Sequence, residues 1–432
     1  MFHAKRFFMN QNPKSNNLRG FKKAKYVALL MATSFLVAYP DSSTKAALED
    51  SPKALVDEVW QIVNNEFVDQ EFNHVNWLNK RKELLQRKYV DQKQAYQAIR
   101  QSLKDLGDPY TRFLEPEEFE ELTSQTTGEL SGIGIRLEID DKTNQLTVVE
   151  PLQNSPAEKA GIKSGDKILQ INDKPTSLMS IEQASTEIKG EVGTEVNLKL
   201  SRSEQEVFEV TLVREQIELP SVEYTLNREG QLNVGYIKLD EFSSHAAEQM
   251  EKAIQELSDR DVSGFVLDLR GNPGGLLFSS VEIARMWLEK GAIVSTIDRK
   301  GGNQKFAANG RALTDLPLVV LVNGYSASAS EILAGALKEN KRATIVGTRT
   351  YGKGTVQSVH SLSDGSGLAV TIARYYPPSG TDINRKGIAP DIQVNLSTQQ
   401  QMNFRINPAL LGTSVDPQYA QAIRILQTTP LN

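Results

Sequence analysis

Apolar residues recur at helical spacing in the first third of the chain. One periodic stretch begins after Ser51-Pro52, which is a typical helix start with proline in the first turn. Two more run from Trp77 to Tyr89 and from Gln94 to Leu106, and Gly107-Asp108-Pro109 ends the last of them. The pattern predicts a helical N-terminal region over residues 47–125.

Beyond residue 126 the pattern changes to short alternating strands separated by glycine and aspartate turns. Gly132–Leu137 and Leu146–Val149 have the composition of strands, and Ser155–Gly161 is a short helix with a serine cap and a closing glycine. A further turn and strand follow at Gly165–Asn172. We expect a small β-rich domain over residues 126–215.

From Leu232 onward, fully apolar strands alternate with helices, which is the pattern of an α/β layer. The strands are expected at Gly264–Arg270, Leu316–Val322 and Ala343–Gly347. The sequence therefore predicts a mixed α/β fold with its core over residues 216–396. The tail at 397–432 is rich in Gln, Asn and Pro, and we interpret it as a polar C-terminal extension.

Charge is distributed unevenly along the 432 residues. Residues 1–46 carry a net charge of +7 and the remainder −12, which argues against nucleic acid as a partner. The basic end precedes an apolar run of about 14 residues from Tyr26 to Tyr39, short for a membrane span but suited to a signal peptide. Thr44-Lys45-Ala46 is a plausible cleavage point, with an uncleaved anchor as the alternative. Either way we expect the body of the protein to be exported.

Two loops carry candidate chemistry, because strands of an α/β sheet deliver them to the edge where ligands bind. The first, Ser326–Glu331, opens a helix, and Ser328 with Glu331 fits a capping box. The same position suits a nucleophile, since free N–H groups of a helix start stabilise an oxyanion. The second loop is Gly352–Gln357. The local pattern alone leaves both roles of Ser328 open.

A nucleophilic serine needs a base, and the credible candidates are His360 and Lys353. Lysine has an ordinary pKa near 10.4, so lowering it to ~7 requires roughly 4–5 kcal/mol of differential stabilisation, which burial can supply. Gly347–Lys353 resembles a phosphate-binding loop but lacks the following Ser or Thr, and no cluster has zinc-ligand spacing. The chain also has no cysteine. A disulfide, a thiol nucleophile and a Cys-ligated metal are therefore excluded.

Five segments together resemble the carboxyl-terminal processing proteases, also called tail-specific proteases, over almost the whole mature length. They are DPYTRFL (108–114), SPAEKAGIKSGDKILQIN (155–172), DLRGNPGG (268–275), VNGYSASASEILAGAL (322–337) and YGKGTVQ (351–357). The resemblance implies a Ser–Lys dyad without cofactor, and its implied residues are the nucleophile Ser328, the base Lys353, the orienting Gln357, and the oxyanion-hole amides of Gly274 and Ala329. Ser326 is the reserve nucleophile. Glu331 and Glu339 stay outside the catalytic set, because family members differ in any third acidic group.

The second segment is also specific to PDZ domains, which bind a peptide C-terminus as an added strand. The resemblance implies that a glycine-containing loop, formed by Ser131, Gly132, Ile133 and Gly134, captures the terminal carboxylate. The expected partner is a protein or peptide with a free C-terminus, and contact with a membrane is expected only through the N-terminal signal or the substrate. Similarity to cyanobacterial and chloroplast members points to a photosystem II reaction-centre precursor in the thylakoid lumen, with general periplasmic processing as the alternative. A non-catalytic PDZ adaptor and a Ser–His hydrolase using His360 are the competing hypotheses.

Overall fold

The computed structural model describes residues 51–429, apart from residues 142 and 204–205. The predicted signal or anchor at 1–46 lies outside these described residues. Across the part that is described, no helix is both long and apolar enough to traverse a bilayer. Helices and strands alternate through this part, so the predicted mixed fold is confirmed.

The predicted helical region is present and packs against a strand from far along the chain. Its elements are α2 (Pro52–Glu66), η1 (Phe72–His74), α3 (Trp77–Gln86) and α4 (Gln92–Lys104). The side chains of Ser51, Asn76 and Asp91 each accept a hydrogen bond from a first-turn amide of α2, α3 and α4, respectively. The apolar faces of these helices share one buried cluster with Leu368 and Val370. This packing joins the helical region to the strand that also carries part of the candidate site.

The β-rich domain follows α5 (Pro116–Thr127). Its elements are β2 (Glu129–Gly132), β3 (Ile135–Ile139), β4 (Leu146–Pro151), α6 (Pro156–Lys159), β5 (Lys167–Ile171), β6 (Lys174–Pro175), α7 (Ile181–Ile188), β7 (Glu195–Ser203), β8 (Glu206–Val213) and β9 (Glu215–Glu218). The main strand order is β3-β4-β5-β7-β8, so β3 has one open edge. A peptide can add as a strand only to such an edge. Strands β2 and β9 pair with each other, where the chain enters and leaves the domain.

A six-stranded sheet forms the centre of the α/β core, in the order β10-β11-β12-β15-β16-β19. The strands are β10 (Val222–Glu229), β11 (Leu232–Leu239), β12 (Gly264–Asp268), β15 (Leu318–Val322), β16 (Thr344–Gly347) and β19 (Ile392–Gln393). All neighbours from β11 to β19 are parallel, and only β10 runs antiparallel. Every residue of β12 and β15 is buried, as expected for parallel strands covered on both faces.

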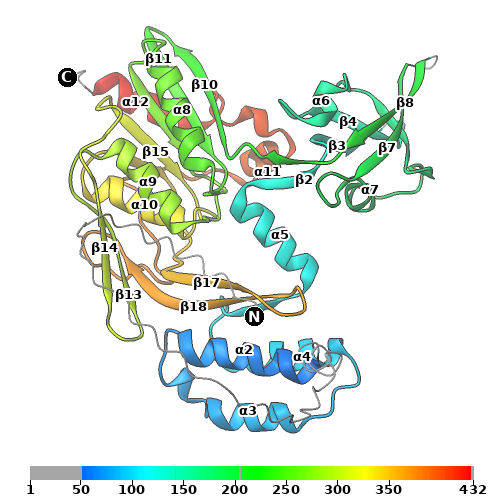
Figure 1. The fold of residues 1–432 in the computed structure, drawn as a ribbon. Helices are drawn as coiled ribbons and strands as arrows, with labels where there is room; N and C mark the ends of the chain where they lie inside the picture. The colour runs from blue at the N-terminus through cyan, green and yellow to red at the C-terminus, as the bar shows by residue number, and fades with distance from the viewer. Residues whose placement is uncertain (1–50, 142, 204–205, 430–432) are drawn as a thin grey trace, which may run out of the picture. The chain divides into compact units, whose positions relative to one another are not determined.

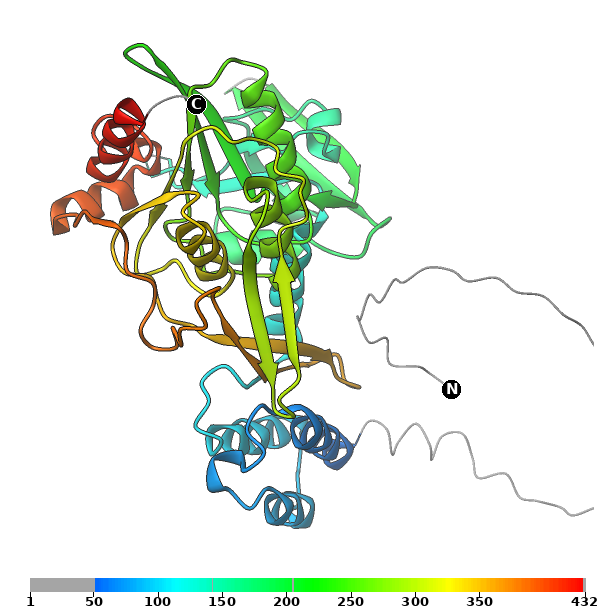
Figure 2. The same cartoon turned by 90° about the vertical axis from the view of Figure 1, so that its left-hand side faces the viewer.

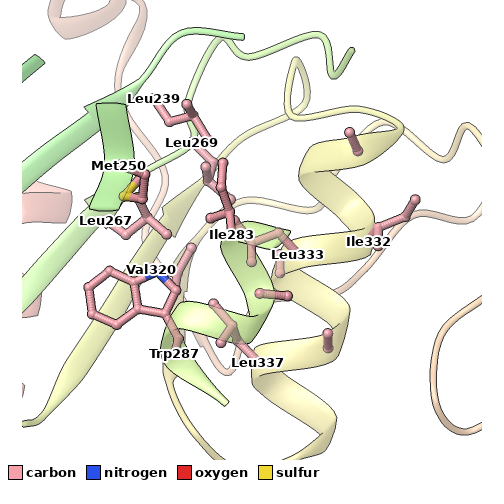
Figure 3. Packing of buried hydrophobic residues seen from close by; sticks show 14 of the residues in the cluster. Leu239, Met250, Leu267, Leu269, Ile283, Trp287, Val320, Ile332, Leu333 and Leu337 are labelled. Carbon is pink, nitrogen blue, oxygen red and sulfur yellow. The ribbon is translucent and has the colours of Figure 1, made fainter. Parts of the chain in front are cut away.

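Helices cover the two faces of this sheet, and alternate strand residues point to each. Leu267 and Val320 belong to the cluster under α8 (Ala246–Ser258), α9 (Leu277–Trp287) and α10 (Ala329–Glu339). Figure 3 shows Trp287 of α9 and Leu333 and Leu337 of α10 in this cluster. The residues that precede or follow Leu267 and Val320 in their strands belong to a second cluster, together with residues of α12 (Pro417–Thr428). Helix α12 is drawn in red in Figures 1 and 2. Because successive side chains of a strand point to opposite faces of the sheet, α12 lies on the face opposite to α8, α9 and α10.

A second sheet carries the predicted lysine loop. Its strands are β1 (Arg112–Leu114), β13 (Ala292–Asp298), β14 (Asn303–Ala307), β17 (Thr355–Ser361) and β18 (Gly367–Tyr376). Strand β18 pairs with β1, β13 and β17, and Figure 1 shows β17 and β18 as adjacent strands. Lys353 lies two residues before β17, so this sheet fixes one side of the candidate site.

The C-terminal extension, with α11 (Thr398–Ile406), η2 (Pro408–Leu410) and α12, is tied to the core by a buried ion network. The Arg270 guanidinium donates to the carboxylates of Asp268 (2.5 Å) and Asp416 (2.7 Å), and both carboxylates are fully buried. Asp416 also accepts from the amides of Gln418 and Tyr419 and so begins α12. The polar composition of this tail therefore includes charges that are buried and paired, and α12 is part of the packed core.

Candidate active site

The predicted nucleophile loop joins β15 to α10. Ser328 is the residue before α10 and has φ 53° and ψ −113°. A side chain with positive φ costs on the order of 1–3 kcal/mol, and such strain is found mainly where geometry serves function. The predicted capping box is present, with the Ser328 amide donating to Glu331 (3.0 Å). Ser328 therefore combines a capping-box hydrogen bond with a positive φ, which is unusual for serine.

The two serines that flank Ser328 in the sequence are structural. The Ser326 hydroxyl donates to the Leu269 carbonyl (2.8 Å) and accepts from the Asn323 amide (3.0 Å). The Ser330 hydroxyl donates to the Asn272 carbonyl (3.0 Å). Both are fully buried, whereas Ser328 is partly exposed. The environment thus favours Ser328 over the reserve nucleophile Ser326.

The second predicted residue, Lys353, is only partly exposed in a glycine-rich turn. Gly352 has φ 92°, and a Cβ there would lie 2.9 Å from backbone nitrogens of the facing loop, so the turn requires glycine. Burial lowers the pKa of Lys353 from its ordinary 10.5, and the nearby Arg112 lowers it further. Asp108 and Glu331 oppose this shift. The direction is the one that a lysine base requires.

Glu331 joins the two loops, although sequence reasoning had left it outside the catalytic set. Its fully buried carboxylate accepts from the amides of Ser328 (3.0 Å) and Lys353 (2.8 Å) through the same oxygen, Oε2. The other oxygen accepts from the Gly352 amide (2.7 Å) and the Thr350 hydroxyl (2.6 Å). Burial raises the pKa of Glu331, and these four hydrogen bonds oppose that rise. One carboxylate therefore fixes the backbones of both candidate catalytic residues.

Tyr375 of β18 also links the backbones of Ser328 and Lys353, through their carbonyl oxygens. Its buried hydroxyl lies 3.1 Å from the Ser328 carbonyl oxygen and also contacts the Lys353 carbonyl oxygen. A single hydroxyl proton is shared between the two acceptors. Glu331 and Tyr375 together hold the backbones of Ser328 and Lys353 side by side. The sequence pattern around Tyr375 did not predict this role.

The side chains of the two residues are nevertheless engaged separately. The Lys353 ammonium lies 4.8 Å from the ring centroid of Tyr110. Within residues 51–429 as described, no hydrogen bond joins Lys353 Nζ to Ser328 Oγ or to Gln357. The Gln357 carboxamide donates instead to the hydroxyls of Thr355 (2.9 Å) and Thr371 (3.3 Å). The orienting role of Gln357 stays a prediction.

His360 lies in a different cluster on β17. Its Nε2 is 2.9 Å from both the Glu66 carboxylate and the Ser358 hydroxyl. These contacts tie β17 to the end of α2. The histidine ring is thus held by Glu66 and Ser358, which does not favour it as the base for Ser328.

The two residues predicted to form the oxyanion hole lie close to the candidate nucleophile Ser328, but the amide of one of them is already hydrogen-bonded. A Cβ on Gly274 would lie 2.8 Å from Ser328 Cβ and 3.0 Å from the Ala329 nitrogen, so Gly274 lies directly beside Ser328 and the Ala329 amide. Its own amide, however, donates to Asn272 Oδ1 (2.8 Å). The Ala329 amide has no backbone acceptor among the described residues. In this conformation the Ala329 amide is available to donate a hydrogen bond to an oxyanion. The Gly274 amide would become a second donor only after its peptide group rotates away from Asn272.

Replacing Gly274 with alanine should therefore lower activity strongly without unfolding the protein. The new methyl group would contact the Ala327 carbonyl (2.8 Å) and Ser328 Cβ, and the backbone has φ 107°, which is strained for alanine. We expect kcat/KM to fall by about 10²–10³-fold, the usual effect of losing an oxyanion donor. Peptide hydrolysis and circular dichroism measure the two effects. Gly271→Ala is a control, because a Cβ there meets nothing within 4 Å although its φ is also positive; equal losses in both variants would contradict the steric argument.

The predicted carboxylate-binding loop lies directly before the open-edged strand β3. Ile133 is fully buried, and Gly134, with φ 72°, packs so closely on Ser155 that a Cβ would lie 2.3 Å from it. The carbonyls of both residues accept hydrogen bonds from the segment around Ser155. Their amides have no hydrogen-bond acceptor within the described chain. The loop thus presents two adjacent N–H groups at the start of the edge strand, while Ser131 donates its hydroxyl to the Gly190 carbonyl.

Comparison with known proteins first identifies the class to which this chain belongs. Residues 233–394 match the model of peptidase family S41, and residues 147–202 match a PDZ domain. Both matches fall inside the ranges predicted for the core and the β-rich domain. The protein is therefore a serine peptidase of the S41 class with a PDZ domain.

Individual relatives narrow the class to a family. The chain is 42% identical over 402 residues, 92% of each protein, to a carboxyl-terminal-processing protease of Synechocystis. It is 39% identical to chloroplastic carboxyl-terminal-processing peptidase 3 of Arabidopsis thaliana, covering 84% of this chain and 72% of that one. A solved photosystem II D1 C-terminal processing protease is 36% identical with a TM-score of 0.52, covering 85% and 99% of the two chains. The chain belongs to the carboxyl-terminal-processing protease family, and the comparison favours the catalytic hypothesis over a PDZ adaptor.

Proposed function

We propose that this protein cleaves near the C-terminus of exported proteins with a Ser328–Lys353 dyad. The observation that carries the proposal is the buried Glu331 carboxylate, which accepts from both backbone amides through one oxygen. Such sharing holds together two residues that are 25 positions apart in the sequence. The lowered pKa of Lys353 supports its role as the base.

The reaction is acyl transfer to water. The neutral Lys353 amine takes the proton of the Ser328 hydroxyl as Oγ attacks a peptide carbonyl. The Ala329 amide donates to the resulting oxyanion, at the positive end of α10. The Lys353 ammonium returns its proton to the leaving amine, and the neutral lysine then activates the water that hydrolyses the acyl ester.

The PDZ domain supplies recognition of the substrate terminus in this proposal. The unpaired amides of Ile133 and Gly134 donate to the terminal carboxylate, and the preceding substrate residues pair with the edge of β3. An amidated terminus lacks the charge that these amides bind. Peptides with amidated C-termini should therefore be cleaved with a higher KM than their free-acid counterparts.

The proposed substrate is a photosystem II reaction-centre precursor in the thylakoid lumen. The relatives from Synechocystis and from chloroplasts support it, as does the solved protease named for D1. Incubation of the protein with the D1 precursor should remove its C-terminal extension, and Ser328→Ala should leave it intact. An untrimmed precursor together with cleavage of an unrelated free-acid peptide would reject this substrate and favour general periplasmic processing.

A further inference from the structure

The segment between α4 and β1 presents an aromatic ring to the candidate base and is itself firmly anchored. The Asp108 carboxylate accepts from the Tyr110 amide (3.2 Å) and from the Thr111 hydroxyl (2.7 Å). The Thr111 hydroxyl in turn accepts from the Thr371 amide of β18 (3.1 Å). Thr111 is buried, so the backbone of Tyr110 is fixed to the same strand that provides Tyr375.

The ring of Tyr110 meets the charged end of Lys353. The distance from Nζ to the ring centroid, 4.8 Å, is within the range of a cation–π interaction. Burial, together with a hydrogen bond to Tyr351, raises the pKa of Tyr110 to about 12. The phenol is therefore neutral at physiological pH, and it is the ring face that attracts the ammonium.

We propose that Tyr110 is a positioning residue of the general base, whose ring face holds the Lys353 ammonium apart from Ser328 in the resting enzyme. The inference rests on the proposed role of Lys353. A ring face attracts the ammonium and not the neutral amine, so Tyr110 stabilises the protonated, resting form. For catalysis the ammonium releases one proton to solvent and leaves the ring, and the neutral amine then accepts the Ser328 proton.

Charged groups on three other positions act on the same amine. Arg112 of β1 disfavours the ammonium, whereas Asp108 and the buried Glu331 favour it. None of these is altered when Tyr110 is replaced. The contribution of the ring can therefore be measured separately from that of the neighbouring charges.

The test compares Tyr110→Leu and Tyr110→Phe with the wild type in the full protein. In Tyr110→Leu the acid limb of the kcat/KM–pH profile should move to lower pH by about 0.5–1.5 units, because the ring no longer stabilises the ammonium. Tyr110→Phe keeps the ring face and should keep the limb within ~0.3 units of the wild type. Tyr96→Leu, in the same helical region but packed on Phe113, is a matched control that should not shift the limb.

A second readout does not depend on activity. Competitive acetylation of the lysines over a pH series, followed by mass spectrometry, gives the pKa of Lys353 against the exposed Lys290 as internal standard. The same downward shift should appear for Tyr110→Leu in the inactive Ser328→Ala background. An unshifted Lys353 in Tyr110→Leu, or an equal shift in Tyr110→Phe, would overturn the inference. Full activity of Lys353→Met would instead reject the dyad, while the acetylation result would still report on Tyr110.

Discussion

Replacing Lys353 with methionine should reduce kcat/KM for a free-acid peptide by at least about 10³-fold, and Ser328→Ala should do the same. Loss of either member of a nucleophile–base pair typically removes this much catalysis or more. Methionine fills the partly buried volume of the lysine without its amine, so the fold should persist. Because burial lowers the pKa of Lys353, the wild-type kcat/KM should rise with pH and reach its plateau below pH 10.5.

Two control variants make this result specific. Lys305→Met removes an exposed lysine of β14 and should leave kcat/KM unchanged within about twofold. His360→Ala should retain most of the activity, because Glu66 and Ser358 hold that ring. An inactive His360→Ala together with an active Lys353→Met would establish a Ser–His mechanism instead.

Replacing Arg270 with methionine should lower the free energy of unfolding by about 3–5 kcal/mol. The change leaves the Asp268 and Asp416 carboxylates buried without their cation, and an unpaired buried charge is strongly destabilising. Urea unfolding of the two proteins measures the difference. Since Arg270 follows β12 and precedes the Gly274 loop, activity should also fall.

A surface ion pair provides the matched control. Arg136 pairs with Glu150 at 2.9 Å, and both side chains are about half exposed (53% and 50%). Arg136→Met should therefore cost less than about 1 kcal/mol. A loss this small in Arg270→Met would contradict the buried-network account.

Periodic patterns predicted most of the fold, because they report on burial that each segment must achieve. The helices from Ser51 to Leu106 and the apolar strands β12 and β15 were predicted in this way. The burial of α12 was not, since Asp416 and Gln418 are polar and only their pairing with Arg270 allows them inside. Composition cannot show which polar residues find partners.

The candidate site was predicted in part for a similar reason. Ser328 and Lys353 follow strand ends, which a sequence pattern can place at one sheet edge. Glu331 was assigned only a local capping role, although its carboxylate also reaches the lysine loop. Tyr110 and Tyr375 reach the site from distant segments, and the direction of the Gly274 amide depends on a single peptide rotation. Tertiary packing alone determines these features.

The most direct measurement is to trap the covalent intermediate. The protein is mixed with a reactive ester of a short peptide, quenched in acid during turnover, digested and sequenced by mass spectrometry. We predict one acyl group on Ser328 in the wild type and none at the same time point in Lys353→Met. Acylation of Ser326, or equal acylation of Ser328 without the lysine amine, would contradict the account.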